Sequence, residues 1–183
     1  RQEDIYQLAY ARYRNGQYAQ AITRFSELNA QENSLGQNAL YCLADCYLKS
    51  GQKAEARNAF AGAMKFSFDL VIKEESNFNY AKLSYELGYE NVSISSLVGF
   101  METCPASAHI AETRELLAEL FLSTRNHQKA LEVLGQMRPL NNRMQRAFQQ
   151  VAYYRGVELY NEGKSAAADS LFNLSLTLPL QPA

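Results

Sequence analysis

A ten-residue pattern recurs along the chain and limits the fold more than any other feature. Residues 16–25 read GQYAQAITRF, residues 51–60 read GQKAEARNAF, and residues 163–172 read GKSAAADSLF. Each copy has Gly, then Ala five residues later, then Phe four residues after that. Similarity at a fixed period of roughly twenty to fifty residues is typical of a solenoid built from stacked units. The pattern therefore predicts repeated units rather than one irregular core.

Four columns keep their character when the chain is aligned on the turn glycine. The turn position recurs after 35, 37, 37 and 38 residues, with a small residue seven positions before it, a second small residue five positions after it, and a large apolar residue nine positions after it. In chain order, the columns are Ala9, Ala44, Ala81, Ala118 and Gly156; Gly16, Gly51, Gly88, Arg125 and Gly163; Ala21, Ala56, Ser93, Ala130 and Ala168; and Phe25, Phe60, Leu97, Leu134 and Phe172.

Each unit is predicted to be a pair of antiparallel helices. Apolar residues recur at helical spacing on both sides of the turn position, for example Leu40, Leu43 and Tyr47 before it and Ala56 and Phe60 after it. Glycine can adopt the left-handed conformation that closes a helix C-terminus. Small residues let two helix backbones approach closely, and the large residue fills the groove beside them. We therefore predict about ten helices and an all-α fold.

Composition excludes several classes of function. Eighteen basic and nineteen acidic residues among 183 give a net charge of −1, whereas surfaces that coat phosphate backbones concentrate positive charge. The chain has no run of eighteen apolar residues that could span a membrane. Because 47% of the residues are apolar, a sizeable core is expected.

No motif for catalysis, cofactor binding or metal binding is found. The chain has no Gly-rich phosphate loop, no H-E-x-x-H and no G-x-S-x-G. Cys42 and Cys46 lie one helical turn apart, which is a weak zinc signal, and packing in or near a core is the stronger interpretation. His109 and His127 fall at predicted helix starts or turns, so a surface turn position is favoured for His127. We expect no enzyme activity, no cofactor and no metal.

Three segments carry a resemblance to a known repeat family. These are YQLAYARYRNGQYAQAITRF, LYCLADCYLKSGQKAEARNAF and YYRGVELYNEGKSAAADSLF. They resemble the tetratricopeptide repeat (TPR), a helix–turn–helix unit of about 34 residues with small and aromatic columns of this kind. Arg125, Arg155 and Ser93 depart from the pattern. The resemblance implies an α-solenoid forming a right-handed superhelix with repeats at 2–35, 37–71, 74–108, 111–146 and 149–183.

The same resemblance implies a binding groove lined by the first helix of each unit. Seven of the twelve tyrosines fall at its lining positions, and Tyr is a rigid contact residue that is inexpensive to immobilise. Packing alone also explains two of these columns, so both interpretations stay open. The implied groove residues are Tyr6, Tyr10, Tyr13, Tyr41, Asp45, Phe78, Lys82, Tyr85, Glu115, Glu119, Tyr153 and Tyr160.

A protein or peptide partner is the favoured ligand of such a groove. The family's chaperone-binding members use Lys and Asn to clamp a carboxylate, but Tyr6, Tyr10, Tyr41 and Asp45 occupy the corresponding positions here. RNA binding by a helical-repeat protein is the alternative, and the near-neutral charge disfavours it. A third alternative is an accessory repeat domain of a larger enzyme. The acidic face of Glu112, Glu115 and Glu119 could attract a cation or basic peptide, although a solvated face is favoured.

Compartment and chain end give two further expectations. CPASAHIAETRELLAELFLSTRNHQKAL is similar to repeats of periplasmic division and outer-membrane-assembly proteins, and other segments resemble long repeat proteins of Bacteroidetes-type bacteria. This suggests the periplasm or cell envelope, with the cytoplasm as the alternative. No charged residue follows Asp169, so we expect further repeats or self-association at this end. Its apolar residues are Leu171, Phe172, Leu174, Leu176 and Leu178.

Overall fold

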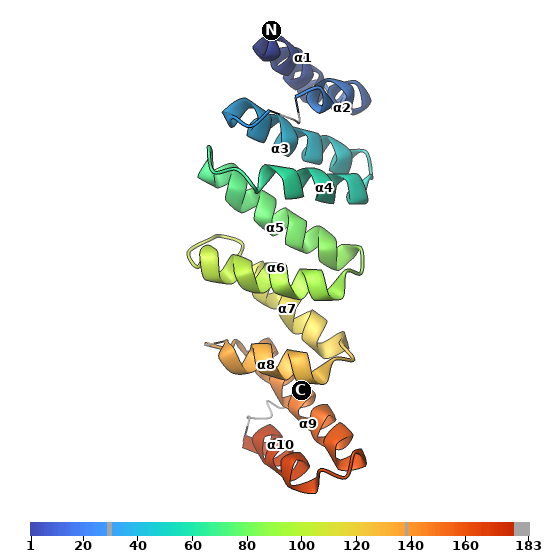
Figure 1. The fold of residues 1–183 in the computed structure, drawn as a ribbon, viewed down its shortest axis with the longest axis vertical. Coiled ribbons are helices and arrows are strands. Elements are labelled where there is room, and N and C mark those ends of the chain that lie inside the picture. The colour runs from blue at the N-terminus through green and yellow to red at the C-terminus, as the bar shows by residue number, and fades with distance from the viewer. Residues whose placement is uncertain (29–30, 138, 178–183) are drawn as a thin grey trace. The chain divides into compact units, whose positions relative to one another are not determined.

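Helices are the regular secondary structure in the computed structural model, which describes residues 1–28, 31–137 and 139–177 (Figure 1). Within these ranges there is no strand, and the predicted all-α architecture of consecutive helical hairpins is confirmed. The helices are α1 (Gln2–Arg14), α2 (Tyr18–Ser26), α3 (Ser34–Lys49), α4 (Lys53–Ala63), α5 (Leu70–Glu86), α6 (Glu90–Thr103), α7 (Ile110–Ser123), α8 (His127–Gln136), α9 (Asn142–Asn161) and α10 (Ser165–Thr177).

The chain divides into two compact units, which are described separately. Unit 1 comprises residues 1–107 with α1 to α6, and unit 2 comprises residues 108–183 with α7 to α10. In unit 1 the helices of each hairpin contact each other, and the first helices α1, α3 and α5 also contact one another in sequence. In unit 2, α9 contacts α7, α8 and α10. None of the described helices is both long and apolar enough to cross a membrane.

Glycine ends the first helix in four of the five hairpins by adopting a left-handed backbone. Gly16, Gly51, Gly88 and Gly163 have φ values of 73°, 75°, 78° and 78°. At the first turn, Gly16 N–H donates to the Tyr13 carbonyl (3.0 Å) and Gln17 N–H donates to the Arg12 carbonyl (2.9 Å). This pair of bonds satisfies carbonyls at the end of the helix that would otherwise lack partners. The predicted role of these glycines is confirmed.

Side chains make the fourth turn, where Arg125 replaces glycine. Thr124 N–H donates to the Leu120 carbonyl (2.8 Å), and the Thr124 hydroxyl accepts from Asn126 N–H (3.1 Å). The Asn126 side chain then caps α8 by accepting from Lys129 N–H (3.1 Å). Because these side chains supply the bonds, this turn needs no left-handed residue.

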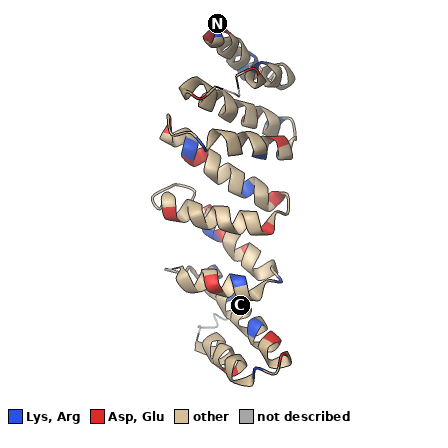
Figure 2. Cartoon of the chain, in the orientation of Figure 1, with Lys and Arg blue, Asp and Glu red and all other residues tan. Residues whose placement is uncertain are grey.

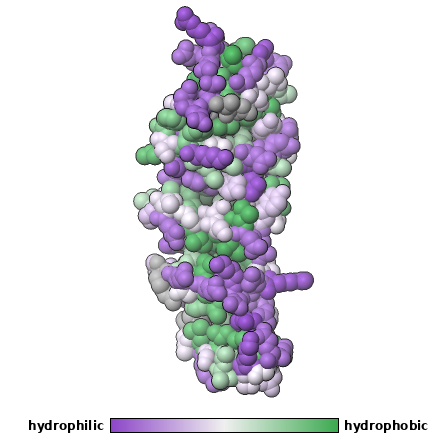
Figure 3. Space-filling view, in the orientation of Figure 1, coloured by the Kyte–Doolittle hydropathy of each residue, from purple (hydrophilic) through white to green (hydrophobic). Residues whose placement is uncertain are grey.

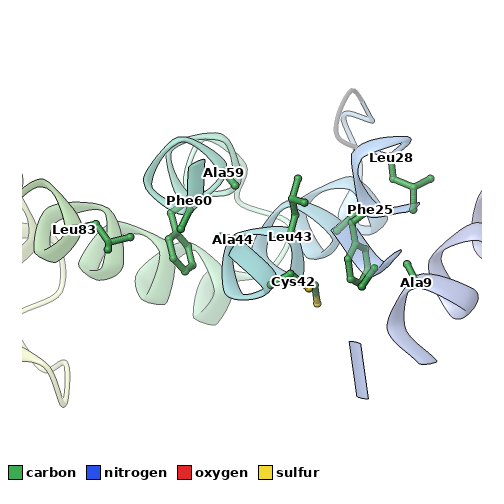
Figure 4. Close-up of a cluster of buried hydrophobic side chains, with 13 residues drawn as sticks. Ala9, Phe25, Leu28, Cys42, Leu43, Ala44, Ala59, Phe60 and Leu83 are labelled. Atoms are coloured by element: carbon green, nitrogen blue, oxygen red, sulfur yellow. The ribbon is translucent and has the colours of Figure 1, made fainter. Parts of the chain in front are cut away.

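Small residues lie where helices of a hairpin approach most closely. A Cβ atom added to Gly156 in α9 would lie 2.7 Å from Cε1 of Phe172 in α10, so no larger residue fits without a shift. In unit 1 the Phe25 side chain lies beside Ala9 (Figure 4). Ser93 keeps its polar group satisfied, since its hydroxyl donates to the Ala81 carbonyl (3.2 Å). Every residue of both small columns is buried.

The buried Gln37 joins the second hairpin to the third. Its amide nitrogen donates to the carbonyls of Ala63 (3.4 Å), Phe66 (3.2 Å) and Asp69 (3.0 Å), and its amide oxygen accepts from Asp69 N–H (2.8 Å). The Asp69 carboxylate in turn caps α5 by accepting from the backbone of Val71 and Ile72. One fully buried side chain therefore fixes the connection between α4 and α5.

The apolar residues of the last helix differ in their exposure. Leu171, Phe172 and Leu174 are half-buried, whereas Leu176 is 78% exposed. Leu178 lies outside the described residues. The expectation of further repeats or self-association at this end stays a prediction.

Replacing Ala44 by Leu is expected to overpack the second hairpin. Ala44 is completely buried, so three added carbon atoms must displace neighbours, at a cost of roughly 1–3 kcal/mol in the free energy of unfolding. Ala54→Leu, at an exposed position of α4, is the matched control and should change stability little. Urea denaturation of both variants gives the comparison, and equal midpoints would contradict the assignment of the small column.

Replacing Gln37 by Leu is expected to cost about 2 kcal/mol or more, because the Asp69 N–H and the carbonyls at the end of α4 lose their partner while buried. The exposed Gln20→Leu is the control for added apolar surface. Thermal denaturation followed by circular dichroism measures both. A variant as stable as the wild type would show that water replaces the amide at no cost.

Candidate functional site

A strip of tyrosines runs along α1 and forms the most exposed aromatic part of the first-helix face of unit 1. We define this face by the predicted groove residues of α1, α3 and α5. The ring of Tyr10 lies 6.0 Å from that of Tyr6, nearly parallel at 11°, and 5.9 Å from that of Tyr13. Beyond the strip, the ring of Tyr13 lies 6.2 Å from that of Tyr18 at the start of α2. The side chain of Tyr10 is 37% exposed, so a partner can reach its ring. The neighbouring rings of Tyr6 and Tyr13 limit the movement of that ring.

The hydroxyl groups of two strip tyrosines hold α1 against α3. Tyr13 donates to the Asp45 carboxylate at 2.6 Å, and Tyr6 donates to the side-chain oxygen of Asn38 at 3.3 Å. The hydrogen bond to Asp45, with burial, raises the pKa of Tyr13, and burial together with nearby Cys42 raises that of Tyr6. Both hydroxyls therefore stay protonated at neutral pH and serve as donors between neighbouring hairpins.

A recurring aromatic pair explains why Tyr occupies one groove column. The ring of Tyr6 lies 5.8 Å from Phe25, Tyr41 lies 5.8 Å from Phe60, and Tyr153 lies 5.9 Å from Phe172. Each pair joins the two helices of one hairpin. Burial raises the pKa of Tyr41, in agreement with a ring that is partly enclosed. Packing is thus one role of this column.

The third hairpin contributes less accessible residues to the first-helix face. Phe78 is only 3% exposed and packs 5.6 Å from Phe100, so a partner cannot reach its ring without rearrangement. The Lys82 ammonium lies over the Phe78 ring at 5.9 Å. Tyr85 is half-buried.

The predicted acidic residues of α7 are paired inside unit 2. The Arg143 guanidinium lies 2.7 Å from the Glu115 carboxylate and 4.0 Å from that of Glu119. Asn141 also donates to Glu115 (3.3 Å). These contacts lessen the negative charge through which the acidic face could have attracted a cation or basic peptide, the less favoured of the two interpretations. Tyr153 and Tyr160 on α9 are 51% and 64% exposed.

His127 belongs to an interhelical cluster in unit 2 rather than to a free surface turn. Its Nδ1 lies 2.6 Å from the Glu158 carboxylate, and its ring stacks on Tyr154 with centroids 5.3 Å apart. Arg155 donates to Glu158 (2.8 Å) and Glu162 (3.3 Å), which accounts for arginine where other units have leucine. Although partial burial opposes the effect, hydrogen bonds from His127 and Arg155 lower the pKa of Glu158.

Arg57 makes a comparable junction in unit 1. It donates to Ser84 (2.7 Å) and Tyr80 (2.9 Å), and its guanidinium lies between the rings of Tyr80 and Tyr89 at 4.5 and 4.6 Å. Sequence reasoning missed Arg57 and Arg143 and placed His127 at a surface turn, because the partners of all three lie in another hairpin and do not recur in the repeat columns. Acidic and basic residues are interspersed along the helices that carry these contacts (Figure 2).

A pocket of unit 1 lies outside the tyrosine strip, since none of its lining residues belongs to that strip. Its volume is about 630 Å³. It lies between α5, α6 and the C-terminal end of α4, and its lining residues include Met64, Leu70, Tyr80 and Phe100. Leu70 is 69% exposed at its rim. Exposed apolar residues are scattered among polar ones over the surface seen in Figure 3.

Two of the three cysteines are placed for packing. Cys42 and Cys46 are buried, and burial raises their thiol pKa values to about 11 and about 12, so the reactive thiolate is scarce at neutral pH. Across the residues that the structure describes, no three His, Cys, Asp or Glu side chains gather in an arrangement that could hold a metal ion.

Comparison with known proteins supports the hairpin architecture. Residues 1–63, which form the first two hairpins, match the family model described as anaphase-promoting complex, cyclosome, subunit 3 (ANAPC3), a TPR-like repeat model. No curated protein matches. The crystal structure of MamA is similar over 92% of both chains, with 16% sequence identity and a TM-score of 0.53.

Two further solved structures match at lower TM-scores. The C-terminal part of a TPR repeat-containing protein from Cytophaga hutchinsonii has 20% identity and a TM-score of 0.46, covering 94% of this chain and 64% of that one. BtubC from P. vanneervenii has 16% identity and a TM-score of 0.45, covering 99% of this chain and 84% of the other. The chain therefore has an α-solenoid fold of TPR-like helical hairpins, the class to which the ANAPC3 match and the MamA likeness point.

Acid is expected to destabilise unit 2 through Glu158. Its pKa is lower in the folded state, so the stabilisation is complete at neutral pH and is lost as the pH falls below about 4.5 and the carboxylate becomes protonated. Glu158→Gln should lower the melting temperature at neutral pH and lessen its dependence on pH in this range. Glu132→Gln, at an exposed ion pair, is the control. If the melting temperatures of the wild type and Glu158→Gln depended on pH in the same way, this role of Glu158 would be contradicted.

Proposed function

We propose that the protein is a non-catalytic interaction module that binds a segment of a partner protein on its first-helix face. The observation that carries the proposal is the tyrosine strip of α1, in which Tyr10 is exposed while its ring lies between those of Tyr6 and Tyr13. A ring that is already ordered loses little entropy on binding and offers both an apolar surface and a hydroxyl group. TPR-like repeats generally serve as protein–protein interaction modules, which supports the same role.

The five hairpins are proposed to act as one continuous right-handed solenoid with the repeat limits given by the sequence. In such an array the first helices of successive repeats line an extended binding surface. In unit 2 the exposed Tyr153 and Tyr160 of the first helix α9 are proposed to contribute lining residues of the same kind. The resemblance of several segments to bacterial envelope-associated repeat proteins leads us to propose an assembly of the cell envelope as its setting.

Site-specific photo-crosslinking tests the proposed surface. A photoreactive phenylalanine analogue at position 10 should yield protein adducts in cells, because the strip would lie against the partner. The same analogue at Tyr89, an exposed tyrosine of unit 1 beside Arg57 and outside the first-helix face, is the matched control. The partner identified at position 10 should bind a Tyr10→Ala variant about tenfold more weakly, while Tyr89→Ala should bind as the wild type does.

Two results would reject this surface. One is a yield of protein adducts from the analogue at position 89 that equals or exceeds the yield from position 10. The other is RNA rather than protein in the adducts at position 10, which would favour the helical-repeat RNA-binding alternative.

A further inference from the structure

Two adjoining pockets follow the first half of α9 in unit 2. One has a volume of about 480 Å³ and extends from Leu122 of α7 to the first turns of α9. The other, of about 400 Å³, extends along α9 to Tyr153 and Tyr154. Arg146 and Gln150 line both pockets, so the two form one surface groove, which we call the α9 groove.

The α9 groove is cationic, and no Asp or Glu is among its lining residues. Arg143 is already held by Glu115 at 2.7 Å. Arg146 is exposed and makes no ion pair or hydrogen bond with any residue that the structure describes. The side-chain amides of Asn142 and Gln150 flank it and can donate hydrogen bonds. An unpaired guanidinium among amide donors favours a carboxylate, which it can bind through two hydrogen bonds.

The other end of the α9 groove is aromatic and ordered. The ring of Tyr153 lies 5.9 Å from Phe172 and 5.7 Å from Tyr154. Tyr154 in turn stacks on His127. Because Tyr153 remains 51% exposed, its free ring surface can cover an apolar or aromatic side chain of a ligand.

The helix sets the distance between the two ends. Arg146 and Tyr153 are seven residues apart, which places them on one side of α9 about 10 Å apart along its axis. A peptide in the extended polyproline II conformation advances about 3.1 Å per residue with three residues per turn, so side chains three positions apart lie on one face and span about that distance. A carboxylate and an apolar side chain three positions apart in an extended segment would therefore reach both ends of the groove.

We propose that the α9 groove binds an extended acidic segment of a protein in which Asp or Glu lies three positions from an aromatic or large aliphatic residue. The proposal rests on the proposed function and specifies the chemistry of the partner at unit 2. A nucleic acid is disfavoured, because a phosphate backbone requires a row of cations and the groove has one unpaired arginine in a chain of net charge −1.

Fluorescence anisotropy with synthetic peptides tests the proposal. The probe is a short fluorescein-labelled Gly/Ser peptide carrying Glu and Phe three positions apart, and its controls replace Glu by Gln or place the two residues side by side. The full chain should bind the probe at least about tenfold more tightly than either control peptide. Arg146→Gln should weaken binding about tenfold, whereas Arg125→Gln, at another exposed arginine of unit 2 outside the groove, should not. Circular dichroism establishes that both variants are folded.

Equal binding of the Glu and Gln peptides, or equal binding by the wild type and Arg146→Gln, would overturn the proposal. So would the absence of probe binding at about 1 mM protein, or displacement of the probe by a single-stranded uridine oligonucleotide at a lower concentration than unlabelled peptide. Protein adducts at position 10 without peptide binding reject the α9 groove alone. Peptide binding without such adducts rejects the tyrosine strip and leaves the groove standing.

Discussion

Close contact between a small residue on one helix and a large residue on the next sets the geometry of each hairpin. At Gly156 an added methyl group would lie 2.7 Å from the Phe172 ring and require a shift, and in unit 1 Ala9 lies beside Phe25. Because the backbones approach so closely, the second helix can hold its aromatic residue against a tyrosine of the first. The positions of Tyr6 and Tyr153 against the second helices of their hairpins follow from this contact.

The features that recur in every unit could be predicted from the sequence, whereas those that occur once could not. The left-handed glycines, the small columns and the all-α fold were predicted, because each is repeated and depends on neighbours within one hairpin. The turn at Thr124 and the pairing of His127 with Glu158 could not, since side chains unique to one unit make them. The ion pair of Glu115 on α7 could not be predicted for the same reason, since its partner Arg143 comes from the following hairpin.

The tyrosines serve two purposes that the sequence pattern does not separate. Tyr13 uses its hydroxyl to bind Asp45 of the next hairpin, and Tyr41 packs on Phe60, so both contribute to stability. Tyr10 and Tyr153 keep exposed ring surface. Burial and hydrogen bonding therefore distinguish a structural tyrosine from one available to a partner, although all occupy the same predicted groove. This explains why binding and packing were equally compatible with the sequence.

The bonds that link successive hairpins join residues that are close along the chain. Tyr6 and Asn38, Tyr13 and Asp45, and Gln37 and Asp69 are each separated by 32 residues. Chains dominated by such near-neighbour contacts close only short loops as they fold, so folding can begin in any hairpin and spread to the next. Under mechanical tension the same arrangement would yield in steps of one hairpin, each extending the chain by a similar length. A protein of this kind would lengthen gradually under load rather than break open at once.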